Sequence, residues 1–321
     1  MSFPIATPFR CLVIDLMHES LLPMLQELGV EVTYVPAVKK EEVPALLPGY
    51  DMLVVRSKLR VTAELLAHAP DLKVVARAGA GVDNIDDGVL EARNITLLNA
   101  PEGNRDAVGD HTLGLLLSLF RKINQGDAQV RAGQWLREEN RGEEIGGKTI
   151  GIIGYGNMGQ AFAKRLSGFD GEVLAYDVQD VANPYPHVRL TSLAEIQQRA
   201  QVLSLHIPYT AANHHFVNAD VIKGFQHPFW LLNTARGEVL DHAALVEGLK
   251  VGQVMGAGLD VLENEKLGTL TPAQQERLQY LYQHPRVIFT PHIGGWTKES
   301  YVRINEVLVR KLKAYLEARA V

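Results

Sequence analysis

The stretch TIGIIGYGNMGQAFAKRL, residues 149–166, decides the fold of the larger part of this chain. An apolar run typical of a buried strand enters a cluster of three glycines and leaves it as a helix-forming segment. Gly154 permits a tight turn, Gly156 lets a pyrophosphate approach the backbone, and Gly159 lets the new helix pack close to the sheet. The pattern predicts a dinucleotide-binding turn between a strand and a helix.

The residues around these glycines support the same interpretation. Asn157 and Met158 begin the predicted helix, where free backbone N–H groups can bind phosphates. The next predicted strand ends in LAYDV, and Asp177 follows Gly154 by 23 residues, close to the spacing of a ribose-binding acid. A carboxylate there accepts hydrogen bonds from ribose hydroxyls and repels a 2′-phosphate, so we expect NAD as the cofactor rather than NADP.

Short apolar segments alternate with helical segments almost throughout the 321 residues. This alternation is typical of parallel sheets with helices on both faces. We expect an α/β protein with two Rossmann-like or flavodoxin-like doubly wound parallel-sheet domains and a cleft between them. Residues 107–135 are expected to form one long helix. The pattern leaves open where the amphipathic helix after residue 297 docks.

The composition narrows the choice of partners and of compartment. Lys and Arg number 32 against 37 Asp and Glu, a net charge of −5, which disfavours nucleic acid or an anionic membrane as the main partner. The single cysteine, Cys11, lies in an apolar run and fits a buried thiol in a reducing cytoplasm. The sequence shows neither a signal-peptide pattern nor an apolar stretch of about 20 residues, so we expect a cytoplasmic protein without a membrane span.

Three charged residues follow predicted strands after the glycine turn: Arg236 in NTARG, Glu265 in GLDVLENE and His292 in TPHIGGW. Ligands of open α/β sheets bind beyond the carboxyl ends of the strands, so these residues are candidates for one site. An arginine can hold a carboxylate, a histidine can move a proton near neutral pH, and a glutamate can orient the imidazole. That set suits hydride transfer between nicotinamide and a 2-hydroxy acid. Taken singly, each residue also has an ordinary structural explanation.

Eight segments of the chain resemble motifs of the D-isomer-specific 2-hydroxyacid dehydrogenases, and the resemblance is strongest to the 3-phosphoglycerate dehydrogenase-like branch. Their order and spacing match that family over nearly the whole sequence. The segments are VVRSKLRVT, VVARAGAGVDNID, NAPEGN…VGDHTLGLLL, GKTIGIIGYGNMG, LHIPYT, LLNTARGEVLD, GAGLDVLENE and TPHIGG.

The resemblance implies roles for individual residues. Arg236, Glu265 and His292 match the catalytic positions. Asp260 matches the acid near the nicotinamide carboxamide, and the remaining cofactor-binding positions are His206, Pro208, Thr234 and Gly294. The positions that match the substrate site are Arg56, Ser57, Arg77, Ala78 and Gly79. Ala78 and Gly79 belong to the loop whose backbone N–H groups hold the substrate carboxylate in the family.

The resemblance also implies an organisation of the chain. Residues 1–103 plus 293–321 would form the substrate-binding domain, because the last helix crosses back in the family, and residues 104–292 would form the NAD-binding domain. We expect a homodimer through the NAD-binding domain and the long helix after NAPEGN. The sequence ends at residue 321 without the regulatory domain of many serine-pathway enzymes. Feedback by serine through such a domain is therefore not expected.

Several positions depart from the family pattern. Lys266 stands where a proline usually follows the catalytic glutamate, which makes Glu263 a rival of Glu265, although the spacing from Asp260 favours Glu265. Trp296 stands where the phosphoglycerate enzymes usually carry a small residue; it could line the pocket or pack the start of the last helix.

Two histidine features suggest other sites. The adjacent pair His214 and His215 is expected to point apart on a surface segment, and we predict no metal site. His111 is expected to be structural.

The sequence therefore predicts an NAD-dependent oxidoreductase that acts on a small D-2-hydroxy acid or its 2-keto acid. The arginines Arg56, Arg60 and Arg77 could offer positive charge to a phosphate, which favours 3-phosphoglycerate as the substrate. A glyoxylate- or hydroxypyruvate-type reductase is the alternative within the enzyme class. An NAD(H)-responsive, corepressor-like interaction protein is the alternative from another class.

Overall fold

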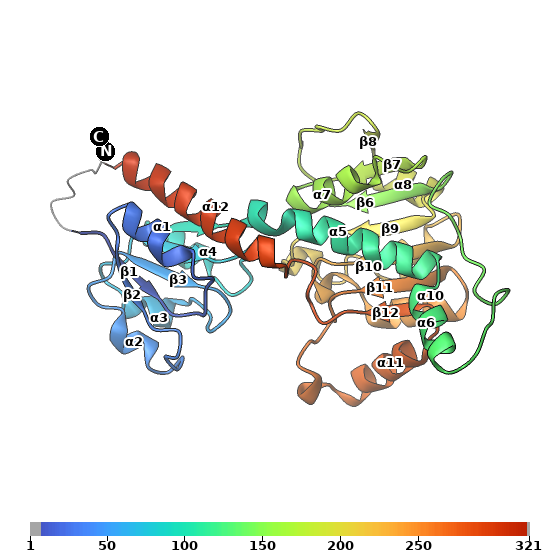
Figure 1. Cartoon of the computed structure of the whole chain (residues 1–321), viewed down its shortest axis with the longest axis horizontal. Coiled ribbons are helices and arrows are strands. Elements are labelled where there is room, and N and C mark those ends of the chain that lie inside the picture. Colours follow the sequence, from blue (N-terminus) through green and yellow to red (C-terminus); the bar gives the residue numbers. More distant parts are fainter. Residues whose placement is uncertain (1–7, 320–321) are drawn as a thin grey trace. The chain divides into compact units, whose positions relative to one another are not determined.

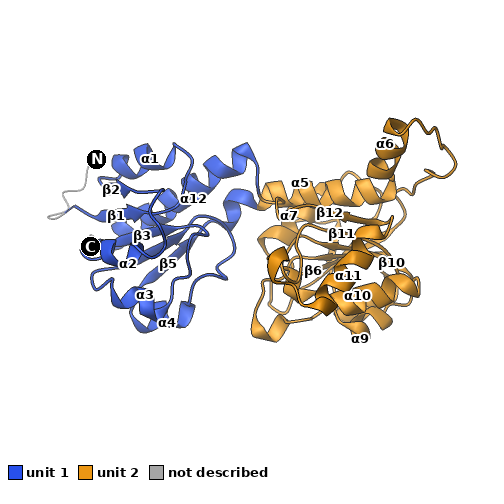
Figure 2. Ribbon diagram, turned by 90° about the horizontal axis from the view of Figure 1, so that it is seen from below, with its two compact units in different colours: residues 1–104, 296–321 blue, residues 105–295 orange. Residues whose placement is uncertain are grey.

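The computed structural model describes residues 8–319, which divide into two compact units (Figures 1 and 2). Unit 1 contains the chain up to residue 104 and from 296 onward, and unit 2 contains residues 105–295. The family resemblance predicts these two junctions after residues 103 and 292. The second junction lies later in the structure because the amides of Ile293 and Gly294 donate to the carboxylate of Asp260, which ties them to unit 2.

Unit 1 is built on a five-stranded parallel sheet with the order β2-β1-β3-β4-β5. Its strands are β1 Arg10–Val13, β2 Glu31–Tyr34, β3 Met52–Val55, β4 Val74–Arg77 and β5 Thr96–Asn99. Its helices are α1 Leu21–Glu27, α2 Val43–Leu46, α3 Ala63–Ala67, α4 Asp87–Ala92 and α12 Lys298–Glu317. The central strand, β3, is buried along its whole length, as expected for a parallel sheet with helices on both faces.

The last helix, α12, completes the core of unit 1, which answers the question that the sequence pattern left open. Thr297 and Ser300 form a capping box at its start. Its apolar stripe, which includes Ile304, Leu308 and Leu312, is buried in the same cluster as strand β1. Figure 1 shows α12 beside α1.

Unit 2 is built on a seven-stranded parallel sheet with the order β12-β11-β10-β9-β6-β7-β8. Its strands are β6 Thr149–Ile153, β7 Glu172–Tyr176, β8 Val188–Leu190, β9 Val202–Leu205, β10 Phe229–Asn233, β11 Val254–Leu259 and β12 Val287–Phe289. Its helices are α6 Ile123–Arg131, α7 Asn157–Leu166, α8 Leu193–Arg199, α9 Ala219–Lys223, α10 His242–Lys250 and α11 Pro272–Gln283, and α5 Pro101–Phe120 runs into it from unit 1. Three short 3₁₀ helices lie at Ala211–Asn213, Gly237–Val239 and Leu267–Thr269.

These two sheets confirm the expected fold class, two doubly wound parallel α/β sheets. The expected single helix over 107–135 is wrong. The helix stops at Phe120 and a second helix starts at Ile123, because Lys122 takes a left-handed backbone with φ +50°. Among the described residues, no helix is long and apolar enough to cross a membrane.

One row of register partners crosses the sheet of unit 2 near the ends of its strands. The row contains Phe289, Leu259, Asn233, Leu205, Ile153 and Tyr176. Because parallel strands run in one direction, the residues that follow this row all leave the sheet at its carboxyl edge. The spacing between neighbouring strands is only about 4.8 Å, so the loops that follow β10, β11 and β12 start side by side.

Candidate active site

Three of the loops at this edge carry the charged residues singled out from the sequence. Arg236 follows β10, Glu265 follows β11, and His292 follows β12, and these strands are neighbours in the sheet. Gly237 lies so close to the loop after β11 that an added Cβ would stand 1.8 Å from the carbonyl oxygen of Leu262. The loop that bears Arg236 is therefore packed against the loop that leads to Glu265.

His292 and Glu265 form a direct pair. The His292 Nδ1 atom lies 2.8 Å from Oε1 and 3.0 Å from Oε2 of Glu265. Both side chains are slightly less than half exposed, so the pair faces solvent rather than the core. With Nδ1 held by the carboxylate, the Nε2 atom has no partner among the described residues and can exchange a proton with a ligand.

The backbone of His292 takes an unusual conformation. His292 has φ +55°, a left-handed value that costs free energy for a residue with a Cβ. Its N–H donates to the carbonyl oxygen of Asp260 at 2.8 Å and to that of Thr290 at 3.0 Å. These two bonds fix the turn, and the contact of Nδ1 with Glu265 orients the imidazole.

Asp260 connects the loop after β11 to the segment that bears His292. Its buried carboxylate accepts hydrogen bonds from Thr290 Oγ1 at 2.6 Å, from the Ile293 amide at 2.8 Å and from the Gly294 amide at 2.7 Å. Burial alone would raise the pKa of Asp260, but these bonds and one from His111 outweigh it and lower the pKa below its ordinary value. Asp260 is thus a charged anchor for residues 290–294.

The structure separates the two glutamates that the sequence left as rivals. Glu263 turns to another group of residues, where its Oε1 lies 2.6 Å from His215 Nε2 and its Oε2 lies 3.9 Å from His242 Nδ1. Glu265 alone of the two contacts His292. The carboxylate beside the histidine is therefore Glu265, as the spacing from Asp260 favoured.

Arg236 lies at the start of the 3₁₀ helix Gly237–Val239 and is half-buried. Its Nη1 donates to the carbonyl oxygen of Ala235 at 2.6 Å, and its own carbonyl accepts a hydrogen bond from Asn233 Nδ2 at 2.9 Å. The guanidinium is thus held against the end of β10, at the same edge of the sheet as Glu265 and His292.

The glycine turn after β6 has the geometry expected from its spacing. Gly154 has φ +89°, and a Cβ there would lie 2.6 Å from the carbonyl oxygen of His206. A Cβ on Gly159 would lie 2.0 Å from the carbonyl oxygen of Gly154, so helix α7 packs directly on the turn. Gly156 is exposed and has open space where a Cβ would stand. Of the three glycines, only Gly156 therefore leaves room for a phosphate beside its backbone.

The surroundings of this turn fit a dinucleotide. Helix α7 begins at Asn157 with no side-chain cap, so the N–H groups of Asn157 and Met158 remain available to phosphate oxygens. Asp177 follows β7 and accepts the amides of Tyr155 at 2.7 Å and of Gln179 at 3.0 Å, one on each carboxylate oxygen. Each oxygen keeps a further lone pair for a ribose hydroxyl.

Two residues expected to line the cofactor are more buried than that role suggests. The His206 imidazole lies in the interior against Phe162, bonded to Ser204 Oγ at 2.8 Å, and burial lowers its pKa to about 3. Only the backbone carbonyl of His206 reaches the glycine turn. Thr234 is also buried and shares a 3.0 Å hydrogen bond with Thr112, whereas Pro208 is exposed.

In unit 1, the predicted substrate residues follow two neighbouring strands. Arg56 and Ser57 follow β3, and Arg77 ends β4, paired in register with Val55. Ala78 and Gly79 open the loop that is expected to hold the substrate carboxylate, but their own amides are bonded within the protein. The Ala78 N–H continues the sheet by donating to Val55 O at 2.9 Å, and the Gly79 N–H donates to Arg77 O at 2.9 Å.

The next two amides of the same loop, those of Ala80 and Gly81, are better candidates for binding the substrate carboxylate than those of Ala78 and Gly79. The N–H groups of Ala80 and Gly81 have no acceptor among the described residues, and both residues are partly exposed. Gly79 has φ +146°, which turns the chain out of the strand just before them. A strand pattern cannot show which amide is the last to bond within the sheet, so the sequence alone could not show which amides of this loop are free.

The structure places one further residue, His111, in contact with the segment that bears His292. His111, on α5, lies with Nε2 2.9 Å from Thr290 Oγ1 and 3.4 Å from Asp260 Oδ1. It therefore belongs to the network that holds residues 290–294. The two residues are 179 positions apart, so no local pattern could have linked His111 to Thr290.

The expectation that His214 and His215 point apart is wrong. Their rings stack with centroids 3.9 Å apart, because the segment is neither helix nor strand and His215 has φ +51°. His215, Asp241 and Glu263 bring their ligand atoms within 4.8 Å of one another. The contact between His215 and Glu263 accounts for the proximity of these two residues, and the absence of a metal site stays a prediction.

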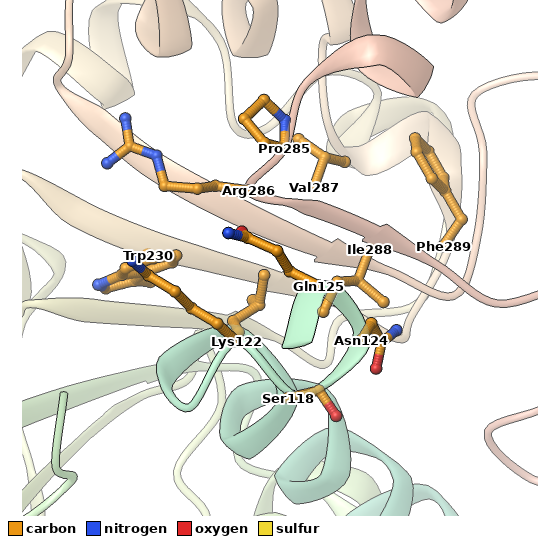
Figure 3. A pocket seen from close by; sticks show the side chains of 11 residues that line it. Ser118, Lys122, Asn124, Gln125, Trp230, Pro285, Arg286, Val287, Ile288 and Phe289 are labelled. Carbon is orange, nitrogen blue, oxygen red and sulfur yellow. The ribbon is translucent and has the colours of Figure 1, made fainter. Parts of the chain in front are cut away.

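A cavity of about 450 Å³ lies elsewhere in unit 2 (Figure 3). It lies between the α5–α6 junction and the strands β10 and β12, and its lining includes Lys122, Gln125, Trp230 and Arg286. Trp230 and Arg286 lie near the starts of these strands, whereas Arg236 and His292 lie beyond their ends. The cavity is therefore separate from the candidate active site.

Comparison with known proteins defines the class of this fold and site. Residues 113–294 match the family model described as D-isomer specific 2-hydroxyacid dehydrogenase, NAD binding domain. The chain is 36% identical over 275 residues to a hydroxypyruvate reductase of Thermotoga maritima, covering 86% of this chain and 88% of that protein. The chain belongs to the D-isomer-specific 2-hydroxyacid dehydrogenase family.

Two further comparisons describe its relatives. A D-3-phosphoglycerate dehydrogenase of Methanocaldococcus jannaschii is 34% identical over 310 residues, which cover 96% of this chain and 57% of that protein. The chain thus spans a little over half the length of that relative. The structure of a D-lactate dehydrogenase of Aquifex aeolicus, complexed with NAD and lactic acid, has a TM-score of 0.82 at 27% identity and covers 96% of each chain.

Proposed function

We propose that this protein is an NAD-dependent dehydrogenase that interconverts a small D-2-hydroxy acid and the corresponding 2-keto acid. The observation that carries the proposal is the pair of His292 and Glu265, which stands at the same edge of the sheet as Arg236 and the glycine turn. A proton carrier, a cation and a dinucleotide-binding turn are the parts that this reaction needs. Membership of the family supports the same conclusion.

His292 moves the hydroxyl proton. In oxidation its Nε2 accepts the proton of the 2-hydroxyl group as the C2–O bond becomes a carbonyl, and in reduction it returns the proton to the oxygen. Glu265, bonded to Nδ1, keeps the ring oriented and stabilises the imidazolium that forms. Because this carboxylate is partly exposed, its contribution comes as much from orientation as from charge.

Arg236 binds the substrate carboxylate and polarises the reacting oxygen. The free amides of Ala80 and Gly81 in unit 1 are two further donors suited to a carboxylate. The substrate is therefore a small acid whose carboxylate is adjacent to the reacting carbon.

NAD would be held by the α7 N-terminus at its pyrophosphate and by Asp177 at its adenosine ribose. When bound, NAD supplies the redox chemistry of the reaction, since it accepts a hydride in one direction and donates one in the other. The free face of Gly156 gives the pyrophosphate access to the backbone.

The first candidate substrate is 3-phosphoglycerate and its keto acid, because Arg56 in unit 1 offers positive charge without an acidic partner among the described residues. The name of the M. jannaschii relative supports this choice. The alternative is a hydroxypyruvate or glyoxylate reductase. The T. maritima relative, most of whose length this chain covers, favours that alternative.

A corepressor-like interaction protein that responds to NAD(H) is the alternative from a different class. Such a protein would bind NADH and reduce no 2-keto acid. The orientation of His292 by Glu265, which leaves Nε2 without a partner among the described residues, favours the enzyme, because a binding role alone does not require it.

We further propose a cytoplasmic homodimer that assembles through unit 2 and binds neither nucleic acid nor membranes. Exposed apolar side chains at Ile123, Val130 and Trp135, on and after α6, support an interface there. The single thiol, Cys11, is fully buried, and burial raises its pKa to about 12, which fits an inert core residue. The net charge of −5 is unfavourable for binding to nucleic acid or anionic lipid.

The test is the oxidation of NADH, followed by its absorbance, with a panel of keto acids. The panel contains 3-phosphohydroxypyruvate, hydroxypyruvate, glyoxylate, pyruvate and a branched 2-keto acid. We expect rapid turnover of at least one substrate and a loss of about 100-fold or more in kcat for His292→Ala. Binding of NADH without turnover of any substrate would contradict the proposal and favour the corepressor-like protein.

The choice of cofactor is tested with Asp177→Asn. The amide oxygen can still accept the Tyr155 N–H, so the turn should stay folded. The lost charge should raise the KM for NADH about tenfold and reduce the preference over NADPH, as expected for the loss of a charged hydrogen bond. An unchanged preference would show that Asp177 does not select the cofactor.

A further inference from the structure

The side chain of Arg56 lies on two aromatic rings of unit 1. Its Cζ atom is 3.8 Å from the ring centroid of Trp296 and 4.7 Å from that of Tyr301. The two rings are 5.6 Å apart and inclined at 43°. Cation–π contacts of this kind favour a guanidinium that lies flat on the ring.

Hydrogen bonds fix the rest of Arg56. Its Nη1 donates to the Tyr301 hydroxyl, which in turn donates to the Leu16 carbonyl at 3.1 Å. Its backbone N–H donates to Asp15 Oδ2 at 2.7 Å, and its carbonyl accepts Asn84 Nδ2 at 3.4 Å. Contacts to the Arg56 backbone and contacts to its guanidinium therefore both restrict the position of this side chain.

The charge of Arg56 is not neutralised by a carboxylate. Among the described residues no acidic side chain forms an ion pair with it, and the nearby Asp15 carboxylate is bonded to its backbone instead. Burial lowers the pKa of Arg56, an effect that Tyr301 and Asp15 partly oppose, yet an arginine remains charged. Arg56 is partly exposed, and its other guanidinium N–H groups have no hydrogen-bond partner in the described structure.

Arg56 stands next to the free amides of the loop after β4. Arg56 follows Val55, whose carbonyl accepts the Ala78 N–H at 2.9 Å. The unpaired amides belong to Ala80 and Gly81, which follow Ala78 by two and three residues. Two anion-binding groups thus occur on adjacent strand ends of one sheet. This suits a short substrate with a carboxylate at one end and a second anion at the other.

Trp296 contributes little to the packing of unit 1. It is 61% exposed, and its ring contacts are those with Arg56 and Tyr301. We propose that Trp296 is a positioning residue for substrate specificity: its indole holds Arg56 flat, so that the free edge of the guanidinium binds a phosphate at the end of the substrate remote from the reacting carbon. This inference rests on the proposed function and names the substrate class, a phosphorylated three-carbon keto acid.

The kinetic test compares 3-phosphohydroxypyruvate with hydroxypyruvate, which differ only in the phosphate. Trp296→Ala should raise the KM for the phosphorylated substrate about tenfold, the size of a partly buried cation–π contact. It should leave kcat and the KM for hydroxypyruvate nearly unchanged. Trp296→Phe keeps an aromatic face and should recover most of the affinity.

A double mutant separates positioning from general packing. If Trp296 acts through Arg56, then Trp296→Ala should add nothing to the KM of Arg56→Ala for the phosphorylated substrate. An additive effect, an equal loss with both substrates, or a lower kcat with no change in KM would overturn the proposal.

A binding measurement makes the test independent of turnover. Calorimetric titration of the full chain with 3-phosphoglycerate should give weaker binding for Trp296→Ala and Arg56→Ala by the same factor, with glycerate as the control ligand. If 3-phosphoglycerate binds and the binding depends on Trp296, but no keto acid is turned over, the proposed function fails while the phosphate-binding role of Arg56 and Trp296 stands. If the wild-type chain does not prefer 3-phosphoglycerate to glycerate, the inference is wrong.

Discussion

At the scale of single residues, the pair of His292 and Glu265 carries the proposed chemistry. Glu263 lies two residues from Glu265 and is bonded to His215 instead. The chain therefore offers two carboxylates of one type, one that contacts the proton carrier and one that does not. This provides a matched comparison.

We predict that Glu265→Gln lowers kcat about 10- to 100-fold, because the amide can hold the ring but cannot stabilise the imidazolium. Glu263→Gln should leave kcat within about twofold, since its partner is His215. Steady-state kinetics on the substrate that the wild-type protein turns over best would measure both. Equal losses in the two variants would argue against the role of Glu265.

The glycines after β6 form a second matched pair. A methyl group at Gly159 would collide with the Gly154 carbonyl, whereas one at Gly156 meets no protein atom within 4 Å. We predict that Gly159→Ala destabilises the protein by about 1–3 kcal/mol, as overpacking does. Gly156→Ala should leave the stability to urea unchanged and weaken NADH binding, measured by fluorescence titration. Unchanged NADH binding in Gly156→Ala would place the pyrophosphate elsewhere.

At the scale of secondary-structure elements, Asp260 joins the end of β11 to the segment after β12. Its carboxylate accepts two amides and a hydroxyl from residues 290–294. The hydrogen bonds lower the pKa of Asp260 despite its burial. A lowered pKa in the folded state means that this stabilisation is complete above the ordinary aspartate value of about 3.9 and is lost as pH falls through the folded value.

We predict that Asp260→Asn destabilises the protein by about 2–3 kcal/mol at pH 7, since an amide cannot accept all these bonds. The difference from wild type should shrink as the pH is lowered below about 4. Urea unfolding at several pH values would measure it, and hydrogen exchange at Ile293 and Gly294 would locate it. A difference that does not depend on pH would indicate a packing effect without the charge.

At the scale of the whole molecule, the two compact units differ in how the chain builds them. Unit 2 is continuous over residues 105–295, whereas unit 1 needs α12 from the far end of the chain. The buried side chains of α12, Ile304, Val307, Leu308 and Leu312, belong to the core that also contains β1. The stability of unit 1 therefore depends on a segment almost 200 residues away from the rest of it.

We predict that a chain truncated after Gly295 unfolds in unit 1 and keeps unit 2 folded. The loss of four buried apolar side chains removes a stabilisation comparable to the whole free energy of unfolding of a small domain. Calorimetry should show loss of one transition, and the truncated protein should still bind NADH. Two unchanged transitions would show that unit 1 folds without α12.

Much of this protein could be predicted from local sequence. The alternation of strands and helices predicts two parallel sheets, which the structure confirms. The spacing of Gly154, Gly156 and Gly159 predicts a turn whose steric requirements are those observed. Both are local features, since a strand, a turn and a helix start are set by residues within one or two turns of chain. They place Arg236, Glu265 and His292 at strand ends without showing what each contacts.

Tertiary structure alone decided the partners. It paired Glu265 with His292 and Glu263 with His215, it committed the Ala78 amide to the sheet, and it brought His111 to Asp260. It also placed Arg56 against the ring of Trp296, a residue far from it in the sequence. Each of these depends on strand order and register across many residues, because a hydrogen bond or ring contact forms only where packing brings two groups within a few ångströms. Sequence determined which chemical groups reach the edge of each sheet, and packing determined which of them act together.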